Sequence, residues 1–452
     1  MPNLVPRALA GCLLCLVSSL SLANSAQPTH EFQLENGLKV IVREDHRAPV
    51  VVSQLWYRVG SSYEPPGQSG LSHALEHMVF KGSSKLCPAE SDHIFQSLGI
   101  SDNAATQSDA TLFFQTLPPY ALAVALEVMA DQMSTAHLSA AHWEGEREVI
   151  KSERSESVDN DPQQRALELP QRLAFPASAS GSPVIGWMHD LERMHVDELK
   201  HWYQSWYAPN NATLIIVGAI DAGQVKALAT RFFGPIAQRQ LPAIKPPLEL
   251  AAPGERSITQ YIDHQIPNLS MTFNVPSLST QTEPHTAAAL ELLSEVLGGG
   301  DSSALKSRLW RGEELVISID SHYSGISRGD VLLSISATLN LEKIKTLSEV
   351  QARIWEVLES LKHTPPSSSD LERARTRIIA RQVFNRDDLQ SLALYLGELD
   401  IAGLSPEHDD KRLQTLKAIT PEDIRHAAQT FLTRDRMTVS HVLPKESRHE
   451  SE

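Results

Sequence analysis

The chain has 452 residues, of which 41% are hydrophobic and 21% are charged, an ordinary composition for a soluble globular protein. This length predicts two or more domains, each large enough for its own core. The formal net charge of −15 argues against a nucleic-acid partner. An acidic surface would suit basic peptides, although solubility is the simpler account of the charge.

The N-terminal segment has the pattern of an export signal. Arg7 is the only charged side chain among the first 29 residues, and the run from 8 to 22 is apolar. This run has about the length of the apolar core of a signal peptide and is short for a membrane span. Small residues follow it, with candidate cleavage points after Ala23 and Ala26. We expect residues 1–23 to be a signal peptide and the protein to be exported, to the periplasm if its source is a Gram-negative bacterium.

The cysteines fit an exported protein without disulfides. Cys12 and Cys15 lie in the predicted signal, so Cys87 remains alone. A single cysteine excludes an internal disulfide and a cysteine metal cluster.

The first half of the remaining chain predicts a mixture of strands and helices. Residues 30–45 alternate around Asn36-Gly37, which is a strong hairpin signal. Further strands are expected at "VVVSQLWYRVG", "ATLFFQTL" and "ATLIIVGAI". A helix with proline near its start is expected at "PPYALAVALEVMADQMS", and residues 139–157 predict a charged helix.

The segment "HALEHMVFKG" predicts a buried helix that carries three polar side chains, those of His73, Glu76 and His77. Positions i, i+3 and i+4 share one helix face, so both imidazoles can reach one metal ion. Zinc takes imidazole ligands, and catalytic zinc sites have three protein ligands and a water molecule. Glu76 is placed to accept a proton from that water. This H-x-x-E-H pattern inverts the H-E-x-x-H zinc motif.

A third ligand is expected downstream, and "EREVIKSERSE" offers candidates. Glu146 and Glu153 are seven residues apart, so they share a face of the predicted charged helix. The alternative is a solvated helix whose acids pair with its own lysine and arginine side chains.

A proline-rich stretch without periodicity, residues 238–256, predicts a linker between two halves. The second half repeats the order of elements, which predicts a duplicated α+β domain. When Gly82 is set against Gly298, the motif residues fall opposite Ala289, Leu292 and Leu293, an ordinary apolar helix. The predicted division is therefore a signal at 1–23, a zinc-binding catalytic domain at 24–237, the linker, and a homologous domain without a metal site at 257–452.

Four segments in order, "GLSHALEHMVFKGS", "NAATQSDAT", "EREVIKSE" and "YAPNNATLIIVG", resemble the pitrilysin/insulinase family of zinc metallopeptidases, in its short two-domain form. The resemblance implies a processing-peptidase-like α+β fold with two tandem domains, each a mostly antiparallel sheet packed with helices. It implies one zinc ion per chain, held by His73, His77 and Glu153. It also implies that Glu76 is the general base and that Glu146 is a supporting carboxylate of the catalytic set.

The same resemblance extends to the substrate. "DNAATQSDAT" matches the family's substrate-binding edge strand, along which an extended peptide would add by main-chain hydrogen bonds. Asn103 and Ala104 occupy the matching positions. The alternative for Asn103 is a turn residue.

The resemblance also implies a second subunit, because family enzymes close a chamber from four such domains. Many members carry an Arg and a Tyr seven residues apart in the second domain, which bind substrate near zinc. Here Trp310 and Ile317 occupy those positions, unless Arg311 or Tyr323 substitutes after a local shift. We therefore expect a heterodimer with a homologous subunit that lacks the zinc motif, with a homodimer as the alternative.

Three functions compete at this stage. The first is an exported zinc endopeptidase that acts on peptides or unfolded polypeptide segments. The second is a non-catalytic structural or partner subunit of a peptidase-like complex, a class that normally loses the motif residues. The third is a metal-storage or metal-sensing module, which would not need Glu76 or the edge strand.

Overall fold

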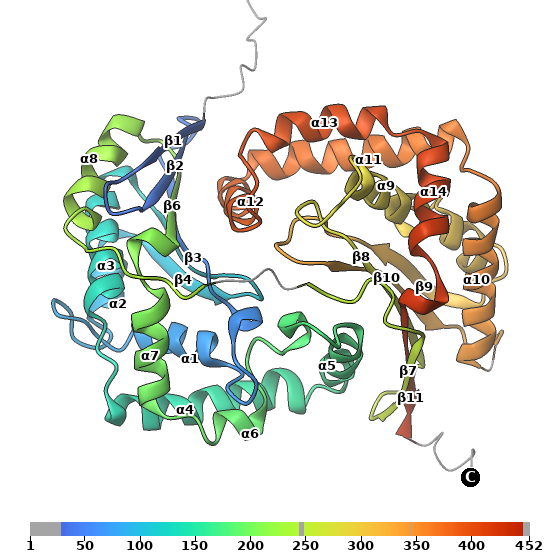
Figure 1. Ribbon diagram of the computed structural model, residues 1–452, viewed down its shortest axis with the longest axis horizontal. Coiled ribbons are helices and arrows are strands. Elements are labelled where there is room, and N and C mark those ends of the chain that lie inside the picture. Colours follow the sequence, from blue (N-terminus) through green and yellow to red (C-terminus); the bar gives the residue numbers. More distant parts are fainter. Residues whose placement is uncertain (1–28, 244–247, 345, 446–452) are drawn as a thin grey trace, which may run out of the picture.

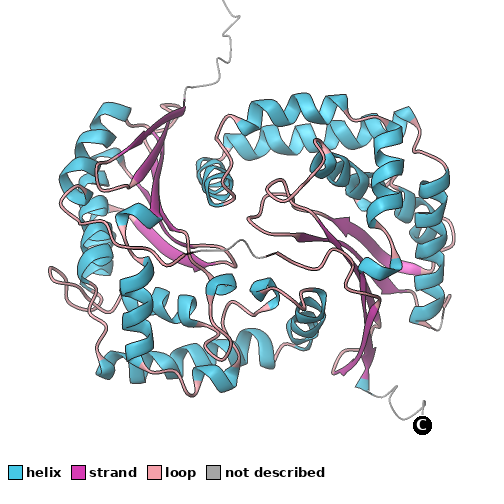
Figure 2. Cartoon of the chain, viewed as in Figure 1, coloured by secondary structure: helices cyan, strands magenta, loops and turns pink. Residues whose placement is uncertain are grey.

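The computed structural model describes residues 29–243, 248–344 and 346–445. The predicted signal peptide and the middle of the predicted linker lie outside these residues. Two lobes follow one another along the chain, and each has one sheet with helices packed against it (Figures 1 and 2). The α+β fold with two tandem domains is thus confirmed. None of the helices in the described part combines the length and the hydropathy of a membrane span.

The strands of the first lobe are β1 (Thr29–Gln33), β2 (Lys39–Glu44), β3 (Val51–Tyr57), β4 (Ser101–Thr106), β5 (Thr111–Leu117) and β6 (Ala212–Gly218). Its helices are α1 (Leu71–Val79), α2 (Glu90–Leu98), α3 (Leu122–Thr135), α4 (Ala140–Arg154), α5 (Pro162–Ala174), α6 (Met188–Leu191), α7 (Val196–Trp206) and α8 (Ala222–Phe233). A π-helical turn, η3 (Ser155–Asp159), continues α4.

The strands of the second lobe are β7 (Arg256–Ile262), β8 (Asn268–Val275), β9 (Val316–His322), β10 (Val331–Leu339) and β11 (Met437–Pro444). Its helices are α9 (Thr286–Gly298), α10 (Leu347–His363), α11 (Ser368–Asp387), α12 (Leu389–Ile401), α13 (His408–Ala418) and α14 (Pro421–Phe431), with a short π-helical turn η6 at Lys306–Trp310.

The two sheets share one topology. Within the described residues, the first has the order β1-β2-β6-β3-β5-β4 and the second the order β7-β11-β8-β10-β9. Each contains one parallel pair, β2 with β6 and β7 with β11, and its other pairs are antiparallel. The second sheet therefore repeats the first without an equivalent of β1. In this correspondence β4 and β9 are equivalent edge strands, so both expose unpaired backbone groups to a possible added strand.

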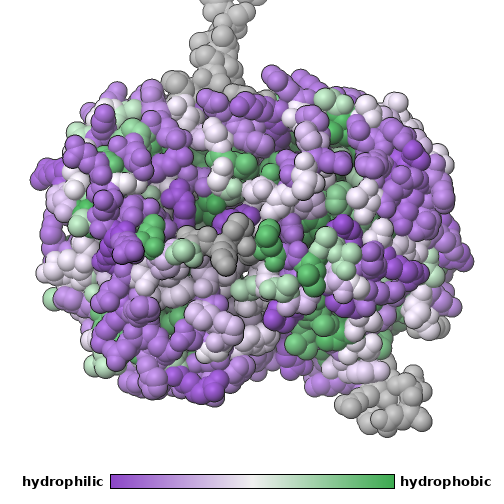
Figure 3. All heavy atoms as spheres, in the orientation of Figure 1, coloured by the Kyte–Doolittle hydropathy of each residue, from purple (hydrophilic) through white to green (hydrophobic). Residues whose placement is uncertain are grey.

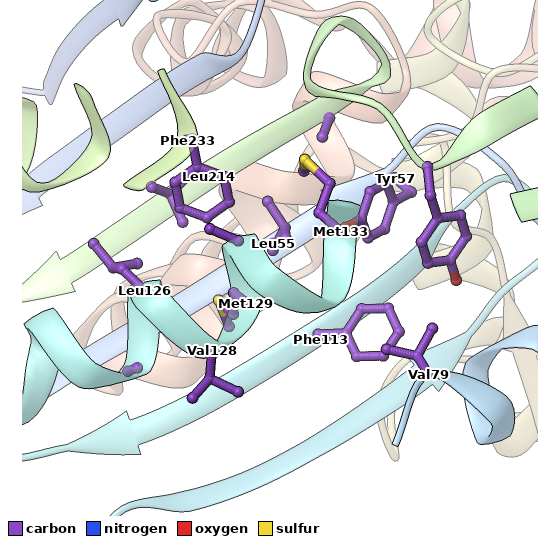
Figure 4. Close-up of a cluster of buried hydrophobic side chains, with 14 of the residues drawn as sticks. Leu55, Tyr57, Val79, Phe113, Leu126, Val128, Met129, Met133, Leu214 and Phe233 are labelled. Carbon is purple, nitrogen blue, oxygen red and sulfur yellow. The ribbon is translucent and has the colours of Figure 1, made fainter. Parts of the chain in front are cut away.

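A hydrophobic core fills the space between the first sheet and its helices. Leu55, Tyr57, Phe113 and Leu214 project from the sheet toward α3, which contributes Leu126, Met129 and Met133 (Figure 4). Burial of such side chains stabilises the lobe by about 1.5–3 kcal/mol each. The face seen in Figure 3 is mostly hydrophilic, and its hydrophobic residues gather toward the middle of the molecule.

One helix of each lobe also packs against the sheet of the other lobe. Helix α5 of the first lobe packs on β7 and β11, and α12 of the second lobe packs on β3 and β6 (Figure 1). At the α12 contact the Asp400 carboxylate, with 4% of its side chain exposed, binds Lys39 at 2.9 Å and Arg58 at 2.5 Å. Thr213 donates a further hydrogen bond of 2.7 Å to it. A buried carboxylate with three donors is satisfied, so this contact ties the lobes together.

Candidate metal centre

Helix α1 begins at a tight turn that brings the motif residues into the lobe. Gly70, the residue before the helix, has a φ of 89°, which favours glycine. The two oxygens of the Glu64 carboxyl group accept hydrogen bonds of 2.7 Å from the backbone N–H groups of Gly70 and Ser72, and so the group caps the helix. The apolar face of α1 packs in the core, and its other face carries His73, Glu76 and His77.

The two histidines and Glu153 lie close together in the structure. The imidazole centroids of His73 and His77 are 4.6 Å apart. Nε2 of His73 lies 3.7 Å from one oxygen of Glu153, and Nε2 of His77 lies 3.4 Å from the other. One ligand atom from each of these three residues lies within 4.8 Å of the others. The three side chains can therefore face one metal ion.

Helix α4 brings both downstream carboxylates to α1. It begins at Ser139, whose hydroxyl accepts a hydrogen bond from the His142 N–H. Two turns separate Glu146 from Glu153, so both face α1. Oε1 of Glu146 accepts a hydrogen bond of 2.9 Å from Nδ1 of His77. The second oxygen of Glu146 binds Nζ of Lys81 at 2.6 Å. Glu146 thereby orients His77 with Nε2 toward Glu153.

The electrostatics differ between the two histidines. Burial lowers the pKa of His73 to about 4, so its imidazole is neutral at pH 7. Burial also lowers the pKa of His77, but hydrogen bonds to Glu153 and Glu146 outweigh it and leave that pKa raised. The hydrogen bond with His77 lowers the pKa of Glu153. Burial opposes the ionised form of Glu146, yet Lys81 and His77 keep its pKa lowered.

Glu76 lies beside this group, with 8% of its surface exposed. Thr106, the last residue of β4, donates a hydrogen bond of 2.5 Å to Oε2 of Glu76. Burial raises the pKa of Glu76, which Thr106 partly opposes. The edge strand β4 thus ends at the motif helix.

Asn103 and Ala104 lie inside β4 and not in a turn. Oδ1 of Asn103 accepts a hydrogen bond of 2.8 Å from the Ala104 N–H, and the Asn103 side chain is exposed. Ala104 is partly buried and packs on the first core. The pairing of β4 with β5 places Asn103 opposite Phe114.

Sequence reasoning missed Lys81 and Thr106. Lys81 follows His77 by four residues, the spacing of one helical turn, and this spacing is the sequence signal that Lys81 lies near His77. Thr106 follows Ala104 by two residues and so points to the same side of the strand. Neither spacing identifies a partner by itself, because both partners come from elements distant in sequence.

The second lobe has an apolar helix where the first has the motif. Ala289, Leu292 and Leu293 of α9 are all buried. In the η6 turn, which precedes the equivalent edge strand, Trp310 is 40% exposed, and in β9 itself Ile317 is 50% exposed. Tyr323 is buried, and its hydroxyl donates to the carbonyl of Pro276 at 2.9 Å. Arg311 is exposed and donates to Ser307. The hydroxyl of Tyr323 is therefore already engaged inside its own lobe.

Comparison with known families gives two matches in tandem. Residues 39–186 match the family described as "Insulinase (Peptidase family M16)", and residues 193–378 match that described as "Peptidase M16 inactive domain". Together they cover most of both lobes. The chain belongs to the M16 family of peptidases.

Two relatives illustrate the range of the family. A protein named "Zinc protease PqqE" from Helicobacter pylori is 28% identical over 440 residues, which cover 95% of this chain and 97% of that protein. "Mitochondrial-processing peptidase subunit beta" from Lentinula edodes is 22% identical over 419 residues, which cover 88% of this chain and 86% of the relative.

Solved structures share the fold. A protease from Helicobacter pylori superposes with a TM-score of 0.85 at 24% identity, covering 92% of this chain and all of that one. The periplasmic protease PqqL from Escherichia coli superposes with a TM-score of 0.79 at 18% identity, and the match covers 93% of this chain but 48% of PqqL. These likenesses concern the fold.

Proposed function

We propose that the chain is a zinc-dependent endopeptidase that hydrolyses peptides or unfolded polypeptide segments. The observation that carries the proposal is the meeting of His73, His77 and Glu153 beside Glu76, at the end of an edge strand. The names of several relatives, which call them zinc proteases, support the choice of metal and reaction.

The donor set fits zinc. Ligands on a tetrahedral zinc, with bonds of about 2.0–2.1 Å, stand about 3.4 Å from each other. Nε2 of His77 already lies 3.4 Å from Glu153, and Nε2 of His73 lies 3.7 Å from it. The Nδ1 atom of His77 is occupied by Glu146, which leaves Nε2 for the metal. Two imidazoles and one carboxylate would leave the site with a charge of about +1 and one open position.

Glu76 carries the proton transfers in this proposal. Bound zinc would supply Lewis acidity that acidifies a water molecule and polarises the substrate carbonyl. The Glu76 carboxylate would accept a proton from that water as the water oxygen bonds to the substrate carbonyl carbon, and would return the proton to the amine nitrogen as the C–N bond breaks. Burial raises the pKa of Glu76, which helps it to hold the proton between the two steps. Thr106 holds Oε2, which directs the other oxygen to the water and substrate.

Substrate would bind as an added strand on β4. Its outer edge is free of a neighbouring strand among the described residues. An extended peptide there gains main-chain hydrogen bonds regardless of its sequence. We assign Asn103 and Ala104 to this contact, because they lie in the middle of the edge. Such recognition favours peptides and unfolded segments over folded proteins.

The proposal includes a second subunit. Trp310 and Ile317 cannot supply the charge or hydroxyl that a substrate-binding Arg and Tyr would supply, and Tyr323 is engaged elsewhere. A homologous subunit that bears those groups and lacks the zinc motif would complete the site as a heterodimer, with a homodimer as the alternative. The length of PqqL, about twice that of the match, and the word "subunit" in one relative's name support pairing.

We also propose that the protein is exported, with residues 1–23 as its signal peptide. The proposed catalytic domain is 24–237, the linker is 238–256 and the second domain is 257–452. The likeness of the fold to PqqL, which is described as a periplasmic protease, supports a periplasmic location. Fractionation of cells that express the full chain tests this, and N-terminal sequencing of the exported form gives the cleavage site.

The experiment for activity uses the purified chain. We expect one zinc ion per chain by elemental analysis, and hydrolysis of an unstructured fluorogenic peptide that strengthens when the homologous partner is added. Full activity of this chain alone, unchanged by the partner, would contradict the proposed heterodimer but would leave the proposed peptidase activity in place. Absence of zinc and of hydrolysis in both preparations would favour the non-catalytic subunit instead.

A further inference from the structure

Glu153 has the most exposed side chain of the residues in the metal centre. Its side chain is 43% exposed, and within the described residues its carboxylate meets two imidazoles and no other hydrogen-bond donor. His77 is held by Glu146, and Glu76 is held by Thr106. The position of the Glu153 carboxylate therefore depends on the backbone at the end of α4.

That backbone leaves α-helical geometry two residues after Glu153, at Ser155. Helix α4 ends at Arg154 and continues as the π-helical turn η3, Ser155–Asp159. Such turns occur frequently at functional sites. The hydroxyl of Ser157 donates a hydrogen bond of 2.7 Å to the Glu153 carbonyl within this turn. The backbone hydrogen bonds change here from the α-helical to the π-helical pattern, and a side-chain contact across to another element would fix where α4 ends.

The side chain of Arg154 provides such a contact. Arg154 is 4% exposed although it is charged. Nη1 and Nη2 donate to the two oxygens of Glu168 on α5 at 2.9 and 3.0 Å. Nη1 also donates to the Gly186 carbonyl at 2.7 Å, and the guanidinium lies 5.6 Å from the centroid of the Trp187 ring. A buried bidentate pair has one favoured geometry, so it resists sliding of α4.

Gly186 in turn abuts the start of α1. Its φ is 86°, and a Cβ atom added to it would lie 2.5 Å from the Ser69 carbonyl oxygen and 2.8 Å from Gly70 Cα. The next residue, Trp187, donates its N–H to the Ser69 hydroxyl at 2.9 Å. The backbone at Gly186 thus packs directly on the backbone of Ser69 and Gly70, at the turn where α1 begins. Helix α1 carries His73 and His77.

We propose that Arg154 is a positioning residue for the third zinc ligand. It sets the distance of Glu153 from His73 and His77 by pinning the end of α4 to Gly186 and hence to the start of α1. This inference rests on the proposed zinc site and adds a role that does not involve contact with zinc or substrate. It also ties the ligand geometry to α5, the helix that packs on the second sheet.

The test compares zinc affinity in four full-length proteins. Arg154→Met removes the guanidinium and keeps the apolar stem. Glu168→Gln keeps Arg154 with its bond to Gly186 but removes the charge of its partner. Arg147→Met is the matched control, because Arg147 lies on the same helix and pairs with exposed Glu144 at 2.6 Å. Affinity is measured by competition with a chromophoric chelator, and Co²⁺ absorption spectra report the ligand geometry.

We expect Arg154→Met to weaken zinc binding by about 10- to 100-fold, the usual effect of losing a group that orients a ligand. Glu168→Gln should weaken it less, Arg147→Met should match the parent, and the Co²⁺ spectrum should change only in the first two. If Arg154→Met does not fold, Glu168→Gln decides by the same readouts. Parent-like affinity and spectra in the folded variants, whatever their melting temperatures, would overturn the inference. A parent chain that binds no zinc would overturn the proposed function as well.

Discussion

Lys81 and His77 bind the two oxygens of a single carboxylate, that of Glu146, at 2.6 and 2.9 Å. The lysine charge keeps the carboxylate ionised, and the ionised carboxylate fixes the imidazole that faces Glu153. Lys81, which follows the motif, thus acts on the proposed metal site through its contact with Glu146 and the hydrogen bond between Glu146 and His77. The arrangement separates the proposed tasks of the two carboxylates of α4: Glu146 orients His77, a proposed ligand, whereas Glu153 is proposed as a ligand itself.

Substitution of the two carboxylates tests this separation. Glu153→Ala should lose zinc and activity together, because it removes one of three ligands. Glu146→Ala should weaken zinc binding or turnover by about 10–100-fold, because His77 remains but loses its orientation. Zinc content after dialysis and peptide hydrolysis measure both. If Glu146→Ala strips the metal while Glu153→Ala retains it, the assignments are reversed.

The hydroxyl of Thr106 should matter for turnover and not for zinc. Thr106→Val keeps the shape of the side chain but removes a hydrogen bond to a carboxylate, which is worth about 1.5–3 kcal/mol. We expect kcat to fall about 10- to 100-fold with unchanged zinc affinity, and Thr106→Ser to restore most of it. Thr116→Val on the neighbouring strand β5 is the control. Parent-like kcat in Thr106→Val would remove Thr106 from the mechanism.

The carboxyl group of Glu64, which caps α1, predicts that the stability of the folded protein depends on pH. Burial raises the pKa of Glu64 from an ordinary 4.5 to about 8, although the Gly70 and Ser72 N–H groups favour its ionised form. The folded state then holds this proton more tightly than the unfolded state. The resulting contribution to stability is full below about pH 4.5 and is lost as the pH rises through about 8.

Urea unfolding of the metal-free chain and of Glu64→Gln at pH 5, 7 and 9 measures this contribution. Glutamine does not titrate, so the free energy of unfolding of the parent minus that of the variant should fall from pH 5 to pH 9. Metal-free protein is used because zinc binding has its own pH dependence. A difference that stays constant or grows with pH would show that Glu64 is ionised throughout.

Much of this architecture follows from local sequence signals. The Asn36-Gly37 hairpin forms between β1 and β2, and residues 140–154 form the expected charged helix, because turn chemistry and helical periodicity are local properties. The apolar α9 likewise lies where the duplication predicts it.

Contacts that depend on the packing of distant elements could not be predicted in this way. Arg154 meets Gly186 across 32 residues, Thr106 meets Glu76 across 30, and Asp400 meets Arg58 across 342. The packing of α5 and α12 on the sheet of the opposite lobe could not be predicted from the sequence either, because an amphipathic helix does not encode which sheet it will cover. Those contacts decide how the site is held.

The measurement that tests the central claim most directly pairs zinc content with hydrolysis in Glu76→Gln. Glu76 is proposed as the base and not as a ligand, so the variant should keep one zinc ion per chain and the parent's melting temperature. Its hydrolysis of an unstructured peptide, with the partner subunit present, should fall by at least 10²–10⁴, the usual contribution of a general base. Hydrolysis within tenfold of the parent, with zinc retained, would contradict the account.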